Sequence, residues 1–146
     1  MALTIGKGLD QKGTPSCPHM TLMGARDVKA GAKIWTGGIT FLEISSGTHV
    51  PALTVANAPN LYRCAGVAGA DGDNTGGQNG DKKIPIERGT FVFRNGTGGD
   101  ALAATHLYGD VYAVDDEIVA NNNAGGTRVR IGEFLGFDEA DRKSTR

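Results

Sequence analysis

The hydrophobic and polar positions of this chain alternate over short runs, and such alternation is typical of β-strands. The clearest run is residues 39–45. Ile39 and Phe41 share one face of this segment, because successive side chains of a strand point to opposite sides. Leu42 and Ile44 share the other face. Apolar residues on both faces predict a central strand that is buried from two sides or lies at an oligomer contact.

Shorter strands are expected on either side of this run. Residues 32–35 and 61–68 are also rich in strand-forming apolar residues. Pro51 has no backbone N–H and interrupts the run before it, so residues 53–56 are predicted to form an edge strand. Residues 69–81 are rich in Gly, Asp and Asn, and they predict an exposed loop.

The second half of the chain continues the same pattern. Residues 83–87 and 90–94 alternate, and Arg88–Gly89 between them favours a tight hairpin. Residues 101–108 are the one candidate helix, with a strand as the alternative, because Ala and Leu favour helices. About eight to ten short strands at intervals of roughly 8–12 residues predict a mainly all-β fold. We expect a small β-barrel or β-sandwich of short antiparallel strands, with long Gly-rich loops and at most one short helix.

The C-terminal region predicts three further extended segments. Residues 111–114 and 117–120 are two short strands, and an Asn- and Gly-rich turn at residues 121–126 separates them from a third at residues 127–137. Three consecutive strands of this kind predict a β-meander. The acidic turn at residues 115–117 is expected to be solvated and to attract Arg or Lys of a partner.

Composition limits the size and the partners of the protein. The 146 residues fit one domain, and the 23 glycines indicate many turns and short strands. We expect an extended N-terminal arm at residues 1–28, a β-rich domain at 29–137 and a polar tail at 138–146. A net charge of −1 gives no basic field, so neither nucleic acid nor a membrane is expected as a partner. No signal peptide or transmembrane run is evident, which predicts synthesis in a reducing cytoplasm.

The predicted arm carries the first candidate contacts. Pro15 and Pro18 bracket Cys17 and remove two backbone donors. The arm is either a floppy terminus or a segment that orders on a neighbouring subunit. In the second case Met20 and Leu22 join the two prolines at an interface. Trp35 is expected to pack in the core, with an interface anchor as the alternative.

No catalytic, cofactor or metal site is predicted, and the protein is not expected to be an enzyme. The loop that begins at Asp71 resembles the start of a calcium loop, but its twelfth position is Lys82 where a bidentate carboxylate is needed. The three histidines, His19, His49 and His106, are too far apart in the sequence to form a zinc pair. The two cysteines, Cys17 and Cys64, are expected to be reduced thiols.

The C-terminal region also resembles a known family, the small capsid decoration (cement) proteins of tailed bacteriophages and prophages. The resemblance covers about 30 residues and rests on a strand, a turn, a Gly-rich loop and a last strand; its residues are Val111, Tyr112, Val114, Asp115, Asp116, Val119, Gly126, Thr127, Arg128, Gly132 and Gly136. It implies a non-enzymatic virion protein on the capsid exterior, a homotrimer whose partner is the major capsid protein.

These expectations define one set of candidate interface residues and one alternative function. The candidate contacts with other subunits or the capsid are Pro15, Pro18, Met20, Leu22, Trp35, Tyr112, Asp115, Asp116 and Arg128. The alternative is a β-sandwich head-fibre or carbohydrate-binding adhesion module, which would expose aromatic residues on one face. The nine aromatic residues are instead spread along the chain.

Overall fold

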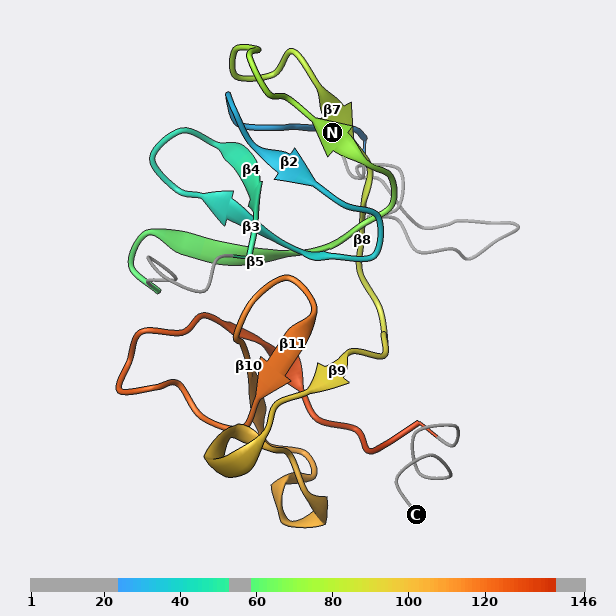
Figure 1. Cartoon of the computed structure of the whole chain (residues 1–146), viewed down its shortest axis with the longest axis vertical. Coiled ribbons are helices and arrows are strands. Elements are labelled where there is room, and N and C mark those ends of the chain that lie inside the picture. Colours follow the sequence, from blue (N-terminus) through green and yellow to red (C-terminus); the bar gives the residue numbers. More distant parts are fainter. Residues whose placement is uncertain (1–23, 53–58, 139–146) are drawn as a thin grey trace, which may run out of the picture.

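The computed structural model describes residues 24–52 and 59–138, and these residues are organised almost entirely by β-strands (Figure 1). They form two four-stranded sheets, one in each half of the molecule, and two two-stranded ribbons. The helical segments of this described part are two short 3-10 turns, Gly98–Asp100 and Ala104–His106. The predicted all-β class is therefore confirmed. None of the described helical segments is long and apolar enough to span a bilayer.

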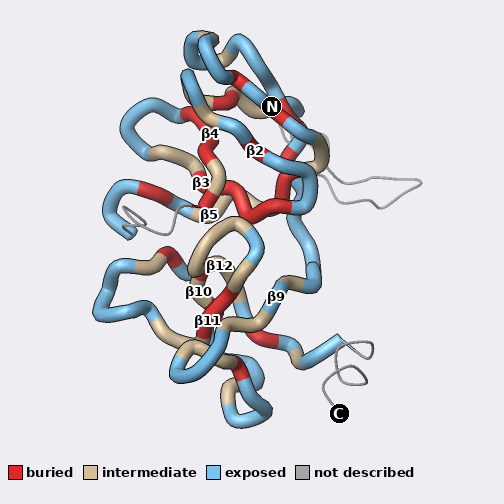
Figure 2. Tube along the Cα trace, in the orientation of Figure 1, coloured by how far each residue is buried: buried red, intermediate tan, exposed pale blue. Residues whose placement is uncertain are grey.

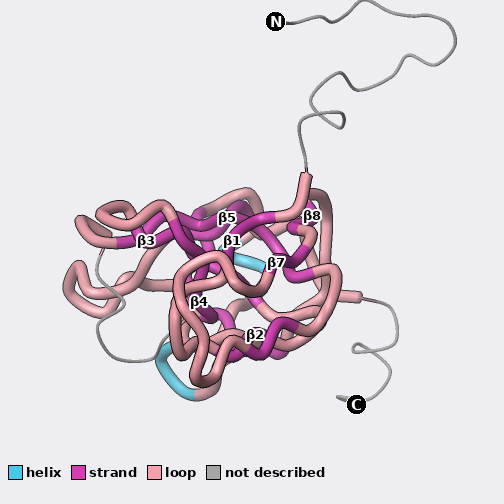
Figure 3. Tube along the Cα trace, turned by 90° about the horizontal axis from the view of Figure 1, so that it is seen from above, coloured by secondary structure: helices cyan, strands magenta, loops and turns pink. Residues whose placement is uncertain are grey.

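The N-terminal half is built around one antiparallel sheet. Its strands are β1 (Arg26–Asp27), β2 (Lys33–Ile34), β3 (Ile39–Glu43), β4 (Thr48–Pro51), β5 (Tyr62–Ala68), β6 (Gly72–Asp73), β7 (Lys83–Ile84) and β8 (Ile86–Glu87). The larger sheet has the order β4-β3-β5-β8, and the ribbons are β1-β7 and β2-β6. The central position predicted for the run at residues 39–45 is confirmed. In the view from above, both ends of the described chain leave on the side of β8 (Figure 3).

The described edge of this sheet does not reach the residues predicted to form it. Strand β4 is the edge strand and ends at Pro51, whereas residues 53–56 lie outside the described residues. A proline is tolerated there because the missing N–H falls at the end of an edge strand. The predicted arm also ends earlier than expected. Strand β1 pairs with β7, and Val28 is fully buried, so the folded part begins before residue 29.

The C-terminal half has the strand order β12-β10-β11-β9, and the predicted meander is wrong. Its strands are β9 (Arg94–Asn95), β10 (Asp110–Ala113), β11 (Ile118–Ala120) and β12 (Arg130–Glu133). Strand β9 pairs in parallel with β11 and takes the edge that a meander would need. The last strand therefore returns to the other side of β10 and pairs with it antiparallel.

Two local predictions are also wrong. Residues 88–93 form no hairpin: the chain crosses from β8 in one sheet to β9 in the other, as Figure 1 shows. Residues 101–108 contain a single 3-10 turn in place of a helix. The backbone N–H of Ala103 donates to Nδ1 of His106 at 2.9 Å, which closes the turn locally. A helix of this length is marginal without packing on both turns.

One apolar core joins the two halves (Figure 2). The N-terminal sheet supplies Ile39, Phe41 and Tyr62, and the rings of the last two lie 6.0 Å apart. The C-terminal sheet supplies further members, which are Leu102, Val111, Ala113, Val119, Val129 and Phe134. A second cluster lies within the N-terminal half alone and contains Val28, Ile34, Ala68, Ile84 and Ile86. The halves are thus two sheets packed on a common core.

The sequence predicted that the glycine- and asparagine-rich loop at residues 69–81 is exposed, but the centre of this loop is buried. Asn74 is 2% exposed. Its Nδ2 lies 2.7–3.1 Å from three carbonyl oxygens, those of Val28, Lys29 and Gln78. The side chain ties residues 28 and 29 to the loop at residues 74–78, which explains why a loop of this composition is buried at its centre.

Candidate functional site

An apolar groove is a concave feature of the described surface. It has a volume of about 760 Å³ and lies between the crossing segment at residues 88–93 and the chain that follows β12, residues 134–138. Core residues of both sheets line its base, among them Ile39, Val111 and Val119. The groove therefore opens directly above the contact between the two halves.

Large apolar side chains on both walls are exposed to solvent. Val92 is 66% exposed on one wall and Leu135 is 56% exposed on the other. The rings of Phe91 and Phe93 lie 6.3 Å apart, and those of Phe134 and Phe137 meet edge to face at 5.3 Å. Such a concentration of exposed apolar surface is typical of an interaction site.

The backbone of both walls is also unpaired. Among the described residues, residues 90–93 and 135–137 form no backbone hydrogen bond. Neither segment contains proline, so every residue keeps its N–H donor. An extended segment with unpaired donors and acceptors is a template for a strand from another chain. Side chains and backbone of the groove thus favour the same kind of partner.

Three of the predicted interface residues come together at the junction of the two halves. The N–H of Gly38 donates to the carbonyl of Trp35 at 3.0 Å, and the next residue, Ile39, donates to the carbonyl of Asp116 at 2.9 Å. This places Trp35 beside the acidic turn that carries Asp115 and Asp116. Trp35 is 54% exposed, so the expectation that it packs in the core is wrong. Its ring lies 5.4 Å from Nζ of Lys33.

The acidic turn uses its carboxylates in different ways. Oδ1 of Asp115 accepts hydrogen bonds from the N–H groups of Glu117 and Ile118 at 2.8 and 2.9 Å, which fixes the turn. Asp116 is half-buried, and burial, with the charges of Asp115 and Glu117, raises the pKa of its carboxyl above the ordinary value. The carboxylate of Glu117 is exposed and lies 3.7 Å from Arg94. The expectation of a fully solvated turn is therefore wrong for Asp116.

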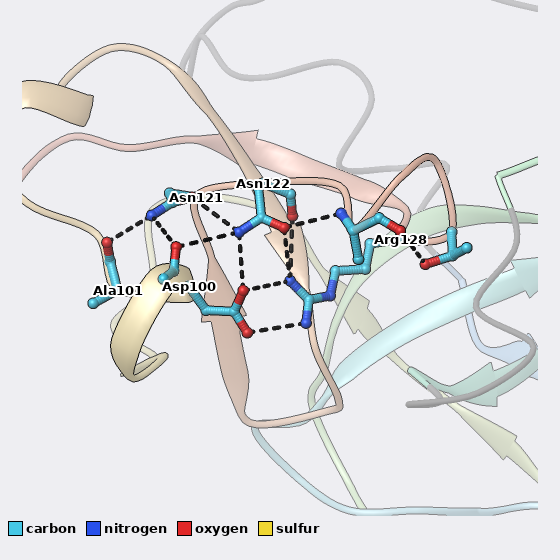
Figure 4. A network of polar contacts seen from close by, with 8 residues as sticks. Asp100, Ala101, Asn121, Asn122 and Arg128 are labelled. Atoms are coloured by element: carbon cyan, nitrogen blue, oxygen red, sulfur yellow. Dashed lines mark hydrogen bonds and ion pairs between the residues drawn. The ribbon is translucent and has the colours of Figure 1, made fainter.

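Arg128 belongs to a polar network inside the C-terminal half (Figure 4). Its two terminal nitrogens each donate to a carboxylate oxygen of Asp100 at 3.0 Å. Nδ2 of Asn122 donates to the same carboxylate at 2.9 Å. These bonds, from Arg128 first and then Asn122, hold the pKa of Asp100 below its ordinary value. The network anchors residues 121–129, the loop that carries the chain around to β12.

The remaining predicted interface residues contribute less to the definition of a site. Tyr112 lies in β10, half-buried, with Ala120 and Arg130 as its neighbours on the two adjacent strands. The four candidates in the N-terminal arm lie outside the described residues; they are Pro15, Pro18, Met20 and Leu22. The structure thus brings together the junction residues but not the whole predicted set.

The described titratable groups that could suggest a metal or catalytic site form no such site. No cluster of three or more His, Cys, Asp and Glu side chains that could hold a metal ion occurs in residues 24–52 and 59–138. The carboxylate of Asp71 accepts two hydrogen bonds from Thr36, and these bonds lower the pKa of Asp71. Cys64 is a free thiol whose pKa is raised by burial. Ala103 donates to the ring of His106.

The groove was missed because its walls were interpreted as strands. Residues 90–94 alternate in the way that a hairpin strand does, and residues 127–137 were assigned to one long strand. The available signal was the pair of aromatic clusters, Phe91–Phe93 and Phe134–Phe137, each of which is too apolar for an ordinary surface loop. No protein-family model, no curated protein and no solved structure matches this chain.

Proposed function

We propose that this protein is a non-enzymatic structural protein of a virion, which binds the outer surface of a phage capsid and stabilises it by cross-bridging major capsid subunits. The observation that carries the proposal is the groove, whose walls combine exposed apolar side chains with unpaired extended backbone. The resemblance of residues 111–136 to capsid decoration proteins supports the same function.

In this proposal an extended segment of a capsid subunit occupies the groove. It pairs with the backbone of residues 90–93, and its alternate side chains replace water against Val92 and Leu135. Burial contributes about 25 cal/mol per Å² of apolar area, and much of that gain is offset by the cost of association. A homotrimer would present three grooves to different capsid subunits, so simultaneous release of all three would be rare.

The test uses purified empty capsids and the full-length protein. Shells that carry the protein are expected to dissociate at a higher temperature than bare shells, and the protein alone is expected to sediment as a homotrimer. The Val92→Asp variant should bind shells about tenfold more weakly or worse, because a carboxylate would be buried without a partner. Leu61→Asp is the matched control, since Leu61 is 50% exposed and does not line the groove.

Two results would contradict the proposal. One is equal co-sedimentation of Val92→Asp and the unmodified protein with shells. The other is an unchanged dissociation temperature when shells are saturated with the protein.

A carbohydrate-binding adhesion module is the second candidate, and one observation favours it. The exposed ring of Trp35 lies at the surface beside a solvated turn, where a sugar could stack on it. Lys33 lies over that ring and occupies part of it. A glycan-array signal that Trp35→Ala abolishes would favour this function over capsid binding.

A further inference from the structure

A second hollow, on the N-terminal half, is lined by cations instead of aromatic rings. It has a volume of about 520 Å³. Three arginines line it, Arg26, Arg63 and Arg88, against one carboxylate, from Asp27. His49 also lines it, and burial lowers the pKa of its ring, which favours the uncharged form. The rest of its lining is small or apolar and consists of Ala25, Leu42, Gly47, Cys64, Ala65 and Ile86. We call it the basic hollow.

The register of the sheet explains why these side chains gather. His49 on β4 and Arg63 on β5 are both directly opposite Leu42 on the central strand. Directly opposed residues project to the same face, so the three side chains stand in a row across the sheet. Arg26 comes from β1 beside the β4 edge, and Arg88 follows β8 at the other edge. Three segments thus bring arginines to one place, beside the buried ring of His49.

The positive charge of the basic hollow is poorly compensated from within. Its single carboxylate, Asp27, already forms an ion pair with Lys83. Among the described residues Arg63 has no ion-pair partner, and Arg88 donates only to the carbonyl of Cys64, at 3.4 Å. The chain as a whole has a net charge of −1, so this concentration of cations is local.

The chemistry of the lining selects the class of ligand. Guanidinium groups bind carboxylates and phosphates through paired hydrogen bonds. Within the described part of the chain no Phe, Tyr or Trp lines the basic hollow, and the ring of His49 is only 7% exposed, so a nucleobase has little aromatic surface to stack on. The net charge of the chain provides no field for a polynucleotide. The volume lies in the range of sites that hold ligands of many atoms, beyond the size of one small oxyanion.

We propose that the basic hollow binds an acidic peptide segment of a partner protein, whose carboxylates pair with Arg63 and Arg88. The basic hollow adjoins the groove, since Cys64, Ala65 and Arg88 line both, but Arg26, His49 and Arg63 line the basic hollow alone. The inference does not depend on the capsid function. Its peptide has to be anionic, whereas the occupant of the groove is recognised by apolar side chains and backbone pairing.

The experiment titrates the purified full-length protein with a fluorescently labelled hexaglutamate peptide and follows anisotropy. Saturable binding is expected, weaker at high salt, with none for a hexaglutamine peptide. The double variant Arg63→Gln/Arg88→Gln should lose at least about tenfold in affinity, because each glutamine removes one charged donor from the peptide carboxylates. Arg94→Gln is the matched control, since Arg94 is an exposed arginine outside the basic hollow.

A second readout covers the case in which the double variant does not fold. His49 is 7% exposed and lies among Arg26, Asp27, Arg63 and Arg88, so its ring resonances in the unmodified protein should shift when hexaglutamate binds. Absent binding, unshifted His49 resonances or equal affinity of a folded double variant would overturn the proposal. Tighter binding of inorganic tripolyphosphate through the same arginines would also overturn it and make the site one for phosphates. None of these results involves capsids, so they are distinguishable from a failure of the capsid assay.

Discussion

The two halves of the molecule obtain their stability in different ways. The N-terminal half has an apolar cluster of its own around Ile34 and Ile84 and also contributes to the shared core. In the C-terminal half, every buried apolar residue that belongs to a cluster belongs to the shared one, as far as the described residues go. Its strands are two to four residues long, too short to bury a core alone. The C-terminal sheet therefore depends on the N-terminal sheet for its apolar contacts.

In both halves asparagine side chains form hydrogen bonds with the backbone, but these asparagines are buried to different degrees. In the N-terminal half Asn74 is fully buried and reaches three carbonyls. In the C-terminal half Asn95 pairs with both the N–H and the carbonyl of Leu102, at 2.8 and 3.1 Å, and Asn122 joins the Arg128 network nearer the surface. Removal of such a hydrogen-bonded polar side chain should therefore lower the free energy of unfolding more in the N-terminal half than in the C-terminal half.

The largest expected effect tests whether the halves are one cooperative unit. Phe41→Ala removes a fully buried ring from the shared core and should lower the free energy of unfolding by about 3–5 kcal/mol. Urea unfolding can be followed by Trp35 fluorescence for the N-terminal half and by the methyl resonances of Val119 for the C-terminal half. Both probes should shift together to lower urea. Separate midpoints in the unmodified protein would show that the core does not couple the halves.

A smaller loss is expected from the buried polar anchor of the N-terminal half. Asn74→Ala removes a buried amide donor shared by three carbonyls, each of which keeps one backbone hydrogen bond, and should destabilise the fold by about 2–3 kcal/mol. Thermal unfolding measures this change. Asn79→Ala is the control, because Asn79 accepts one exposed hydrogen bond from the N–H of Ala30 and its loss should cost under about 1 kcal/mol. Equal effects of the two variants would contradict the anchoring role of Asn74.

The corresponding anchor of the C-terminal half should matter less. Arg128→Gln breaks the paired bonds to Asp100 and should cost about 1–2 kcal/mol, with faster amide hydrogen exchange confined to residues 121–129. The pKa of Asp100 lies below its ordinary value of 3.8, so its stabilising effect is present above pH 3.8 and is lost as the pH falls through the folded-state pKa. Arg128→Gln should remove this pH-dependent contribution of Asp100 to the stability. A larger loss than that of Asn74→Ala would reverse the proposed ranking.

The smallest expected effect is at the junction of the two halves. There a substitution should raise the free energy of unfolding instead of lowering it. The pKa of Asp116 is raised, so its ionised carboxylate destabilises the fold at neutral pH, and the penalty disappears as the pH falls below the ordinary value of 3.8. Asp116→Asn should stabilise the protein at pH 7 by about 0.5 kcal/mol or less, given solvent screening, and should be neutral near pH 3. Thermal unfolding at the two pH values checks this. Destabilisation at pH 7 would mean that the carboxylate has a favourable partner at the junction.

Local patterns were sufficient to identify the strands with the strongest signals. The runs at residues 39–45, 61–68 and 117–120 contain β3, β5 and β11, and the segment at 111–114 overlaps β10 in three residues, 111–113. In each, β-branched, aromatic or aliphatic residues lie between clear turn residues, and nearby sequence alone determines the conformation. The all-β class follows from their number and spacing.

Strand order and the groove depend on contacts between distant residues, which periodicity does not encode. The sequence near β12 does not indicate that β9 pairs with the free edge of β11. The alternation at residues 90–94 has the period of a strand, but residues 90–93 connect two sheets and have no backbone partner, and only Arg94 belongs to a paired strand. The sequence around Asn74 has the composition of a solvated loop. Asn74 is buried only because β1 and the neighbouring segments pack against it.

The position of β12 has a consequence for how the protein is made. The apolar cluster of the N-terminal half is complete once Ile86 has been synthesised, whereas the shared core still lacks Val129 and Phe134 at that point. Translation proceeds from the N-terminus, and N-terminal parts fold first. A chain that ends before β12 therefore leaves the core around Ile39 and Phe41 incomplete, and the core closes only after Val129 and Phe134 have been added.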